Sequence, residues 1–260
     1  MNEQVRERRI GMKKKLIFIA VLFVFAATPA FGDPYNGAGY YGGIYDYTRP
    51  YGIGSGGEFT LTPDASSTVI LSTSAYHSST KGIGGAGSFQ SFCIETDEYI
   101  YQNSHIWVSE ASKETPLVYG SGSHAWDGGV QTGGDNLDPE TAWLYTQFAT
   151  GQLTAAVAGA DYRYGGTISQ RQADAGELQN AIWWLEGELT TKPTTTKAAA
   201  WITAAEGCGW NGIGQVRILQ LYDGNNGFRQ DQLYLVPIPG AVLLGLLGLG
   251  AAGLKIRKFA

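Results

Sequence analysis

The chain has 260 residues, of which 43% are hydrophobic and 16% are charged, and its formal net charge at pH 7 is −5. The two ends hold nine of the 18 Lys and Arg residues but only two of the 23 Asp and Glu residues, which leaves residues 33–240 with a net charge of −12. Because such a surface repels phosphate backbones, the composition argues against nucleic acid as a partner. The acidic body is long enough for one large domain or two small ones.

The N-terminal end predicts an exported protein. Three lysines at 13–15 precede an apolar run from Leu16 to Ala27, and Ala30-Phe31-Gly32 has the small-x-small pattern of a cleavage site. This order predicts a signal peptide over 1–32, with the mature chain beginning at Asp33. Met12 stands directly before the lysines and is a second candidate for the first residue of the chain.

Strand-like sequence follows a Gly- and Tyr-rich segment. Residues 33–57 are interpreted as the mature N-terminus, part of which packs through its aromatic side chains, and the folded domain is predicted over 58–235. Four runs with β-branched or alternating character predict strands in the first part of the domain. These runs are Glu58–Thr62, Thr68–Ser72, Ser88–Ile94 and His105–Val108.

Three helices are predicted next. Asp138 is an N-cap followed by a proline at the first helical position, and this helix is expected to end near Gly151. Ser169 is expected to cap the second helix, which runs to about Glu188. A threonine cluster at 194–196 begins the third helix, which is expected to end near Gly207.

Two further strands, Gln215–Tyr222 and Gln232–Val236, are predicted before the C-terminal tail. An order of strands, then helices, then strands predicts an α+β fold. The expected architecture is an antiparallel sheet or barrel with an inserted layer of about three helices.

Cys93 and Gln179 are the two residues that could carry chemistry. Cys93 lies near the end of a strand-like run, and Gln179 lies at the margin of the apolar stripe of the second helix, beside Trp183. Ala175 and Gly176, one turn earlier, are small residues. Because long helical side chains lean toward the preceding turn, we expect an open approach to the Gln179 carboxamide from that side.

The sequences Phe92-Cys93-Ile94-Glu95 and Leu178-Gln179-Asn180-Ala181-Ile182-Trp183 resemble the two motifs of the TQxA-type thioester domains of bacterial surface adhesins. The resemblance spans roughly 88–206 and implies an internal thioester between Cys93 and Gln179. A target amine or hydroxyl opens such a bond once and leaves a covalent amide or ester, so the protein is not an enzyme. A thioester needs shielding from water. Candidate walls of the shielding pocket are Phe92, Trp143, Ile182 and Trp183.

Other interpretations of these residues stay open. Cys93 could instead form a disulfide with Cys208, as is common in exported proteins, within a non-covalent structural protein that associates with exopolysaccharide. A cysteine-nucleophile enzyme is a third possibility. The histidines at 77, 105 and 124 lack the spacing of metal ligands, so no metal or other cofactor is expected.

The C-terminal residues 236–258 resemble a PEP-CTERM sorting tail. Val236-Pro237-Ile238-Pro239 stands where that family has its Pro-Glu-Pro-like motif, with Ile238 in the place of Glu, and a Leu- and Gly-rich run and a basic end follow. The apolar run is about 28 Å long as a helix, enough to cross a membrane. The resemblance implies recognition by an exosortase, with the basic end cytoplasmic. It also implies delivery to the cell surface or extracellular matrix of a Gram-negative-type bacterium.

Overall fold

The computed structural model describes residues 42–54, 56–63, 71–96, 99–100, 104–108, 137–222 and 228–237. All of them belong to one compact unit that spans residues 39–237. The predicted signal peptide, the predicted membrane helix of the tail and most of the predicted strand Thr68–Ser72 lie outside the described residues. Within the described ranges, no helix combines the length and the apolar character needed to cross a membrane.

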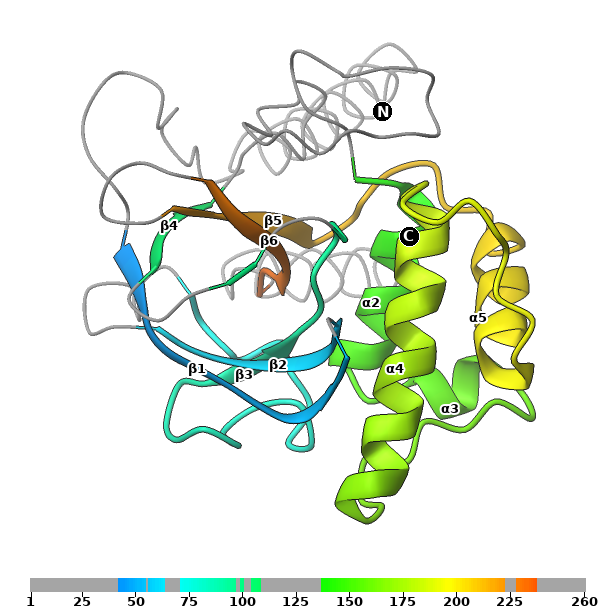
Figure 1. The fold of residues 1–260 in the computed structure, drawn as a ribbon, viewed down its shortest axis with the longest axis horizontal. Coiled ribbons are helices and arrows are strands. Elements are labelled where there is room, and N and C mark those ends of the chain that lie inside the picture. The colour runs from blue at the N-terminus through cyan, green and yellow to red at the C-terminus, as the bar shows by residue number, and fades with distance from the viewer. Residues whose placement is uncertain are drawn as a thin grey trace, which may run out of the picture. The chain divides into compact units, whose positions relative to one another are not determined.

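In the described part of the chain, six antiparallel strands form one sheet in the order β3-β2-β1-β4-β5-β6 (Figure 1). They are β1 (Gly42–Ile53), β2 (Gly56–Pro63), β3 (Phe89–Ser91), β4 (Ser104–Val108), β5 (Val216–Tyr222) and β6 (Phe228–Leu235). An isolated bridge between Cys93 and Gln232 joins the chain just beyond β3 to β6. The two edges of the sheet therefore meet at one point, but the described strands do not close a barrel.

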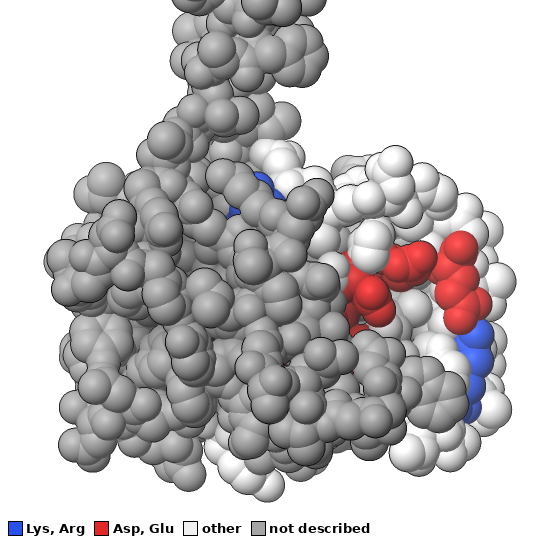
Figure 2. All heavy atoms as spheres, turned by 90° about the horizontal axis from the view of Figure 1, so that it is seen from above, with Lys and Arg blue, Asp and Glu red and all other residues white. Residues whose placement is uncertain are grey.

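Four helices are present in the described part of the chain, so the α+β class is confirmed. They are α2 (Pro139–Ala149), the single-turn α3 (Leu153–Ala156), α4 (Ile168–Leu185) and α5 (Thr196–Glu206). Helix α4 packs against β1 and β2 on one side and against α5 on the other, so it stands between the sheet and α5 (Figure 1). Viewed from above, Asp and Glu side chains gather in one group on the described surface (Figure 2), in keeping with the acidic composition.

Helix boundaries follow the capping chemistry of the sequence. Asp138 is the N-cap of α2 and is followed by a proline, as predicted. The prediction that Ser169 caps α4 is wrong, because Thr167 is the N-cap and forms a capping box with Gln170. The Thr167 hydroxyl accepts from the Gln170 backbone N–H at 3.3 Å, and the Gln170 carboxamide oxygen accepts from the Thr167 N–H at 3.0 Å. Helix α4 ends at Leu185, three residues before the predicted end.

Strand β1 lies in the Gly- and Tyr-rich segment that the sequence assigned to the mature N-terminus. It pairs with β2 through a tight hairpin, in which Ile53 is opposite Gly56, and with β4 on its other side. The hairpin needs residues with positive φ, and Gly54 (φ +56°) and Gly57 (φ +92°) supply them. The sheet therefore begins before residue 58.

A buried ion pair fixes the position of α4 against the sheet. The Arg171 guanidinium of α4 donates to both carboxylate oxygens of Glu58 on β2, and its Nε lies 2.8 Å from Oε2. The Tyr162 hydroxyl donates to the same Oε2 at 2.7 Å. Glu58 and Arg171 are both buried. Gln179 lies eight residues after Arg171, or about 12 Å further along the helix, so this ion pair helps to set its height beside the strands.

Candidate functional site

Cys93 and Gln179, 86 positions apart in the chain, meet in the protein interior. The Cys93 thiol donates a hydrogen bond to Oε1 of Gln179, with 3.2 Å between the sulfur and the oxygen. In return, Nε2 of Gln179 donates to the backbone oxygen of Cys93 at 2.7 Å. Cys93 has no exposed surface and Gln179 is 1% exposed. The structure thus brings the two candidate residues into direct contact and holds the carboxamide at both ends.

The strand side of the site is set by pairing with β6. Beyond β3, the Leu233 N–H donates to the Phe92 oxygen at 3.0 Å and the Ile94 N–H donates to the Asp231 oxygen at 3.3 Å. Successive side chains of an extended segment point to opposite faces. Phe92 accordingly packs edge-on against Phe148 of α2, with ring centroids 4.9 Å apart, whereas Cys93 contacts Gln179.

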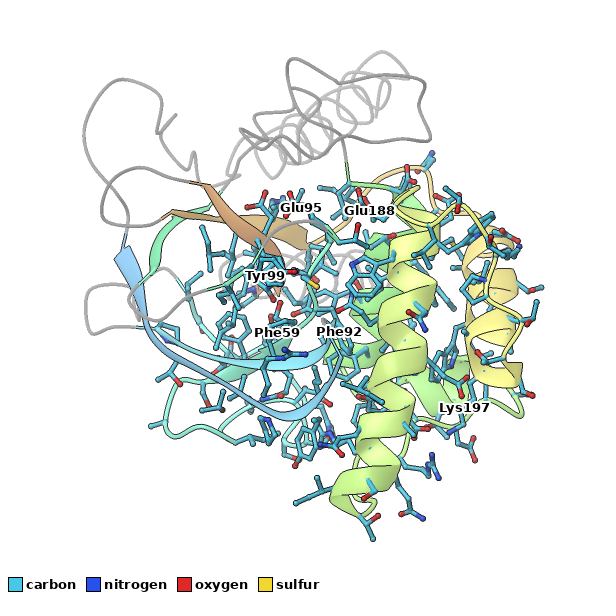
Figure 3. The ribbon with its side chains drawn as sticks, viewed as in Figure 1. Phe59, Phe92, Glu95, Tyr99, Glu188 and Lys197 are labelled. Carbon is cyan, nitrogen blue, oxygen red and sulfur yellow. The ribbon has the colours of Figure 1, made fainter. Side chains whose placement is uncertain are left out.

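The helix side is tied to the same segment by further hydrogen bonds. The Trp183 indole N–H donates to the Glu95 backbone oxygen at 3.2 Å. Just beyond α4, Oε2 of Glu188 accepts from the Thr96 backbone N–H at 3.0 Å and from its hydroxyl at 2.8 Å. Figure 3 shows Glu95 and Glu188 at the same end of the region between the sheet and α4. These contacts hold the residues after Cys93 against the end of the helix that carries Gln179.

The β1–β2 hairpin covers the pair. A Cβ atom added at Gly56 would lie 2.5 Å from Cγ of Gln179 and 2.6 Å from Cη2 of Trp183, so only glycine allows this close approach. A Cβ added at Gly176 would lie 2.6 Å from Cγ2 of Ile53. Ile53 therefore occupies the space beside Gly176, and the approach that the sequence led us to expect as open is filled by the hairpin.

The electrostatic surroundings keep Cys93 protonated. Burial is the largest effect and raises the pKa of the Cys93 thiol far above its ordinary value, and the negative charge of Glu95 raises it further. The positive charge of Arg49 acts in the opposite direction but is outweighed. At neutral pH, Cys93 is thus a thiol, which agrees with its role as a hydrogen-bond donor to Gln179.

The predicted wall residues differ in their positions. Trp183 and Ile182 are buried, and Trp183 lies against the pair through its contacts with Gly56 and Glu95. Phe92 is buried but packs toward α2. Trp143 is partly buried and packs against the hydrophobic core.

The second cysteine is not joined to the first. Cys93 and Cys208 are both free, and the Cys208 sulfur accepts a weak hydrogen bond from the Trp210 N–H at 3.4 Å. The disulfide alternative is therefore not formed in the structure. Among the described residues, no group of three or more His, Cys, Asp or Glu side chains could hold a metal ion, and His124 lies outside these residues.

Three residues of the site were not found from the sequence. Gly56 belongs to a Gly-Gly pair that indicates only a turn. Arg49 precedes the predicted domain, yet its Nη2 donates to the backbone oxygens of Gly54, at 2.9 Å, and of Gly56. Gln232 begins a predicted strand, and nothing in its neighbourhood in sequence indicates that it lies opposite Cys93.

A comparison of the chain with protein-family models, curated protein sequences and solved structures finds no match.

The contact allows one direct reaction. The Cys93 sulfur can attack the Gln179 carboxamide carbon, which forms an S–C bond and moves the carbonyl electron pair onto Oε1. Collapse of this tetrahedral intermediate breaks the C–N bond, and ammonia leaves with the former thiol proton. The products are an internal thioester and free ammonia. Because both side chains are buried, the thioester would form out of contact with bulk water.

Proposed function

We propose that the protein is an exported cell-surface or extracellular-matrix protein that attaches covalently to another molecule through a Cys93–Gln179 thioester. The observation that carries this proposal is the buried contact in which the Cys93 thiol donates to the Gln179 carboxamide oxygen and the carboxamide nitrogen donates to the Cys93 backbone oxygen. A target amine or hydroxyl attacks the Gln179 carbonyl, and the Cys93 thiol leaves. Each molecule reacts once, so the activity is adhesion rather than enzymatic turnover.

The sequences at the two ends of the chain support a location outside the cell, which this chemistry needs. The signal-like sequence of 1–32 and the PEP-CTERM-like sequence of 236–258 support export, a passage through the inner membrane and recognition by an exosortase. Delivery to the surface or matrix of a Gram-negative-type bacterium gives the thioester access to polymers or proteins that carry amines or hydroxyls.

The alternative is a structural surface protein, associated with exopolysaccharide without covalent chemistry, that contains a Cys93–Cys208 disulfide. The free state of both cysteines and the engagement of Cys93 with Gln179 favour the thioester over this alternative.

Labelling with isotopic methylamine tests the proposal. The exported full chain is expected to take up one methylamine, with the label on residue 179 in a peptide map and one newly reactive thiol on Cys93. The Cys93→Ala variant should take up none, whereas the matched Cys208→Ala variant should label as the wild type does. Label that persists without Cys93, or a peptide that joins Cys93 to Cys208, would contradict the proposal, and repeated turnover would indicate an enzyme.

A further inference from the structure

Gln232 of β6 carries a buried carboxamide without a partner. The residue has no exposed surface, and in the part of the chain that the structure describes neither Nε2 nor Oε1 has a hydrogen-bond partner. Buried amide groups in proteins are nearly always hydrogen-bonded, because leaving one unpaired lowers stability. An exception that is fully buried therefore suggests a function in which the amide gains its partner only during a reaction.

The register places this carboxamide beside the reacting atoms. Cys93 and Gln232 form an antiparallel bridge, flanked by the hydrogen bonds from Ile94 to Asp231 and from Leu233 to Phe92. This pattern makes Cys93 and Gln232 a non-hydrogen-bonded pair, the arrangement in which facing side chains come closest, with Cβ atoms about 4.5–5.5 Å apart. The two side chains share one face of the strands, and on that face the Cys93 sulfur touches Oε1 of Gln179.

A cation lies on the same face. Phe59 is paired with Ser91, two residues before Cys93, so the Phe59 ring is on the Cys93 face of the strands. The Arg49 guanidinium lies over this ring at 4.9 Å from its centroid, and its buried Nε also lacks a hydrogen-bond partner among the described residues. Arg49 therefore supplies one positive charge near Cys93, which offsets part of the effect of the negatively charged Glu95.

The reaction itself removes a hydrogen bond from Oε1. In the unreacted pair, the only hydrogen-bond donor to Oε1 of Gln179 among the described residues is the Cys93 thiol. When the sulfur attacks the carbonyl carbon, the thiol can no longer donate a hydrogen bond to Oε1. The same step places negative charge on that oxygen. A second donor is then needed, and an interaction made only in the transition state is the kind that accelerates a reaction.

We propose that Gln232 is the oxyanion donor of this site, with its Nε2–H group donating to Oε1 of Gln179 in the tetrahedral intermediate. The assignment rests on the proposed function. In formation, the S–C bond is made, the C–N bond breaks and ammonia leaves with the thiol proton. In opening by an amine, a new C–N bond is made, the S–C bond breaks and Cys93 leaves as a thiol with a proton from the amine. Both directions place the negative charge on the same oxygen.

Replacement of Gln232 in the full chain tests this role. The Gln232→Leu and Gln232→Glu variants both lose the N–H donor and keep a side chain of similar length. For each, the fraction of freshly purified protein that holds the thioester is measured by intact mass, and the rate of methylamine uptake is measured for that fraction. Loss of one oxyanion donor typically slows a reaction by about 100-fold or more. We expect a rate loss of this order or an undetectable thioester in both variants.

Urea unfolding separates the reactive role from a structural one. Since the Gln232 amide is unpaired, the Leu variant is expected to unfold at the same or a higher urea concentration than the wild type. The matched control is Gln90→Leu, which removes a buried carboxamide that exchanges hydrogen bonds of 2.8 and 3.0 Å with Thr60. That variant should unfold at lower urea but label at the wild-type rate.

The outcomes are distinguishable. Wild-type labelling in Gln232→Leu and Gln232→Glu would overturn the oxyanion role and leave the thioester intact. A fall in labelling matched by a lower unfolding midpoint in Gln232→Leu would assign a structural role instead and also overturn it. If the wild-type chain itself neither lacks ammonia nor takes up methylamine, the thioester and the role of Gln232 are both wrong.

Discussion

Gln179 binds Cys93 through both ends of its carboxamide, because its oxygen accepts from the thiol at 3.2 Å and its nitrogen donates to the cysteine's own backbone oxygen at 2.7 Å. The second bond orients the carboxamide and keeps its nitrogen, the future leaving group, next to the backbone of the attacking residue. The identity of this amide therefore decides both the local stability and the chemistry of the site.

Gln179→Glu should abolish methylamine labelling. A carboxylate cannot release ammonia, and it would place an acceptor oxygen opposite the Cys93 backbone oxygen. The loss of the donor in a buried site should lower the free energy of unfolding by about 1–3 kcal/mol, measured by urea denaturation. Asn180→Asp, which makes the same chemical change at the adjacent, half-buried position, is the control and should keep its label. Equal labelling in the two variants would contradict the assignment of the acyl group to residue 179.

Gly56→Ala should displace the hairpin from the site. The new methyl group would lie 2.5 Å from Gln179 Cγ, closer than real side chains tolerate, so either the hairpin or Gln179 must move. We expect a loss of about 1–3 kcal/mol in the free energy of unfolding, together with a smaller fraction of thioester by intact mass.

The matched control for that change is Gly165→Ala, since a Cβ at Gly165 meets nothing within 4 Å and its backbone is not in the left-handed region. This variant should match the wild type in both measurements. A Gly56→Ala protein with full thioester content and unchanged stability would show that the hairpin does not press on Gln179.

Trp183→Phe should weaken the attachment of the strand to the helix. Phenylalanine keeps an aromatic ring beside Gly56 but cannot donate to the Glu95 backbone oxygen, which now accepts at 3.2 Å from the indole N–H. The expected loss is about 1 kcal/mol in urea unfolding, with faster spontaneous hydrolysis of the thioester. Trp184→Phe, at the partly buried neighbour, should leave the hydrolysis rate unchanged. Equal hydrolysis in both variants would exclude Trp183 as part of the shield.

The positions of Cys93 and Gln179 in their elements could be read from the sequence because both depend on local patterns. A short apolar strand and an amphipathic helix place the residues on definable faces, and Leu178 and Ile182 are buried as the stripe of α4 predicts. Residue type alone predicts the wrong N-cap for α4, because serine is at least as good a cap as threonine. Only the reciprocal bonds with Gln170 decide between them.

The remaining parts depend on pairing between distant segments. Strand β1 could not be predicted, because its Gly- and Tyr-rich sequence lacks a clear alternation of polar and apolar residues. Its place in the sheet is set by pairing with β2 and β4. Gln232 gains its position opposite Cys93 only through the register of β6 with the chain beyond β3. No local signal specifies such a register, since a shift of one residue would turn every side chain to the other face.

The ion pairs of the Asp174 carboxylate should make the stability of the protein depend on pH. Its carboxylate accepts from the Arg163 guanidinium at 2.7 and 2.8 Å and from the Lys197 ammonium, and so ties α4 to the preceding loop and to α5. Burial alone would raise the pKa of Asp174, but these two cations outweigh burial and hold the pKa below its ordinary value. A lowered folded-state pKa means that the stabilisation is present above about pH 4 and is lost as the pH falls through the folded-state pKa.

The Asp174→Asn variant should therefore be less stable than the wild type at pH 7, by about 1–2 kcal/mol given the partial exposure of Arg163 and Lys197. The difference should shrink as the pH falls below about 4, because protonation removes the same charge from the wild type. Urea unfolding at several pH values measures this difference. A stability difference between the wild type and the variant that stays constant down to acid pH would show that the two cations do not stabilise the ionised form of Asp174.

The intact mass of the full chain, purified after export and without exposure to amines, tests the thioester most directly. The expected mass is lower by one ammonia than the sequence between its observed termini requires, and the Cys93→Ala variant should lack this deficit. A mass that matches the unmodified sequence, or one that is lower by only two hydrogens, would contradict the thioester.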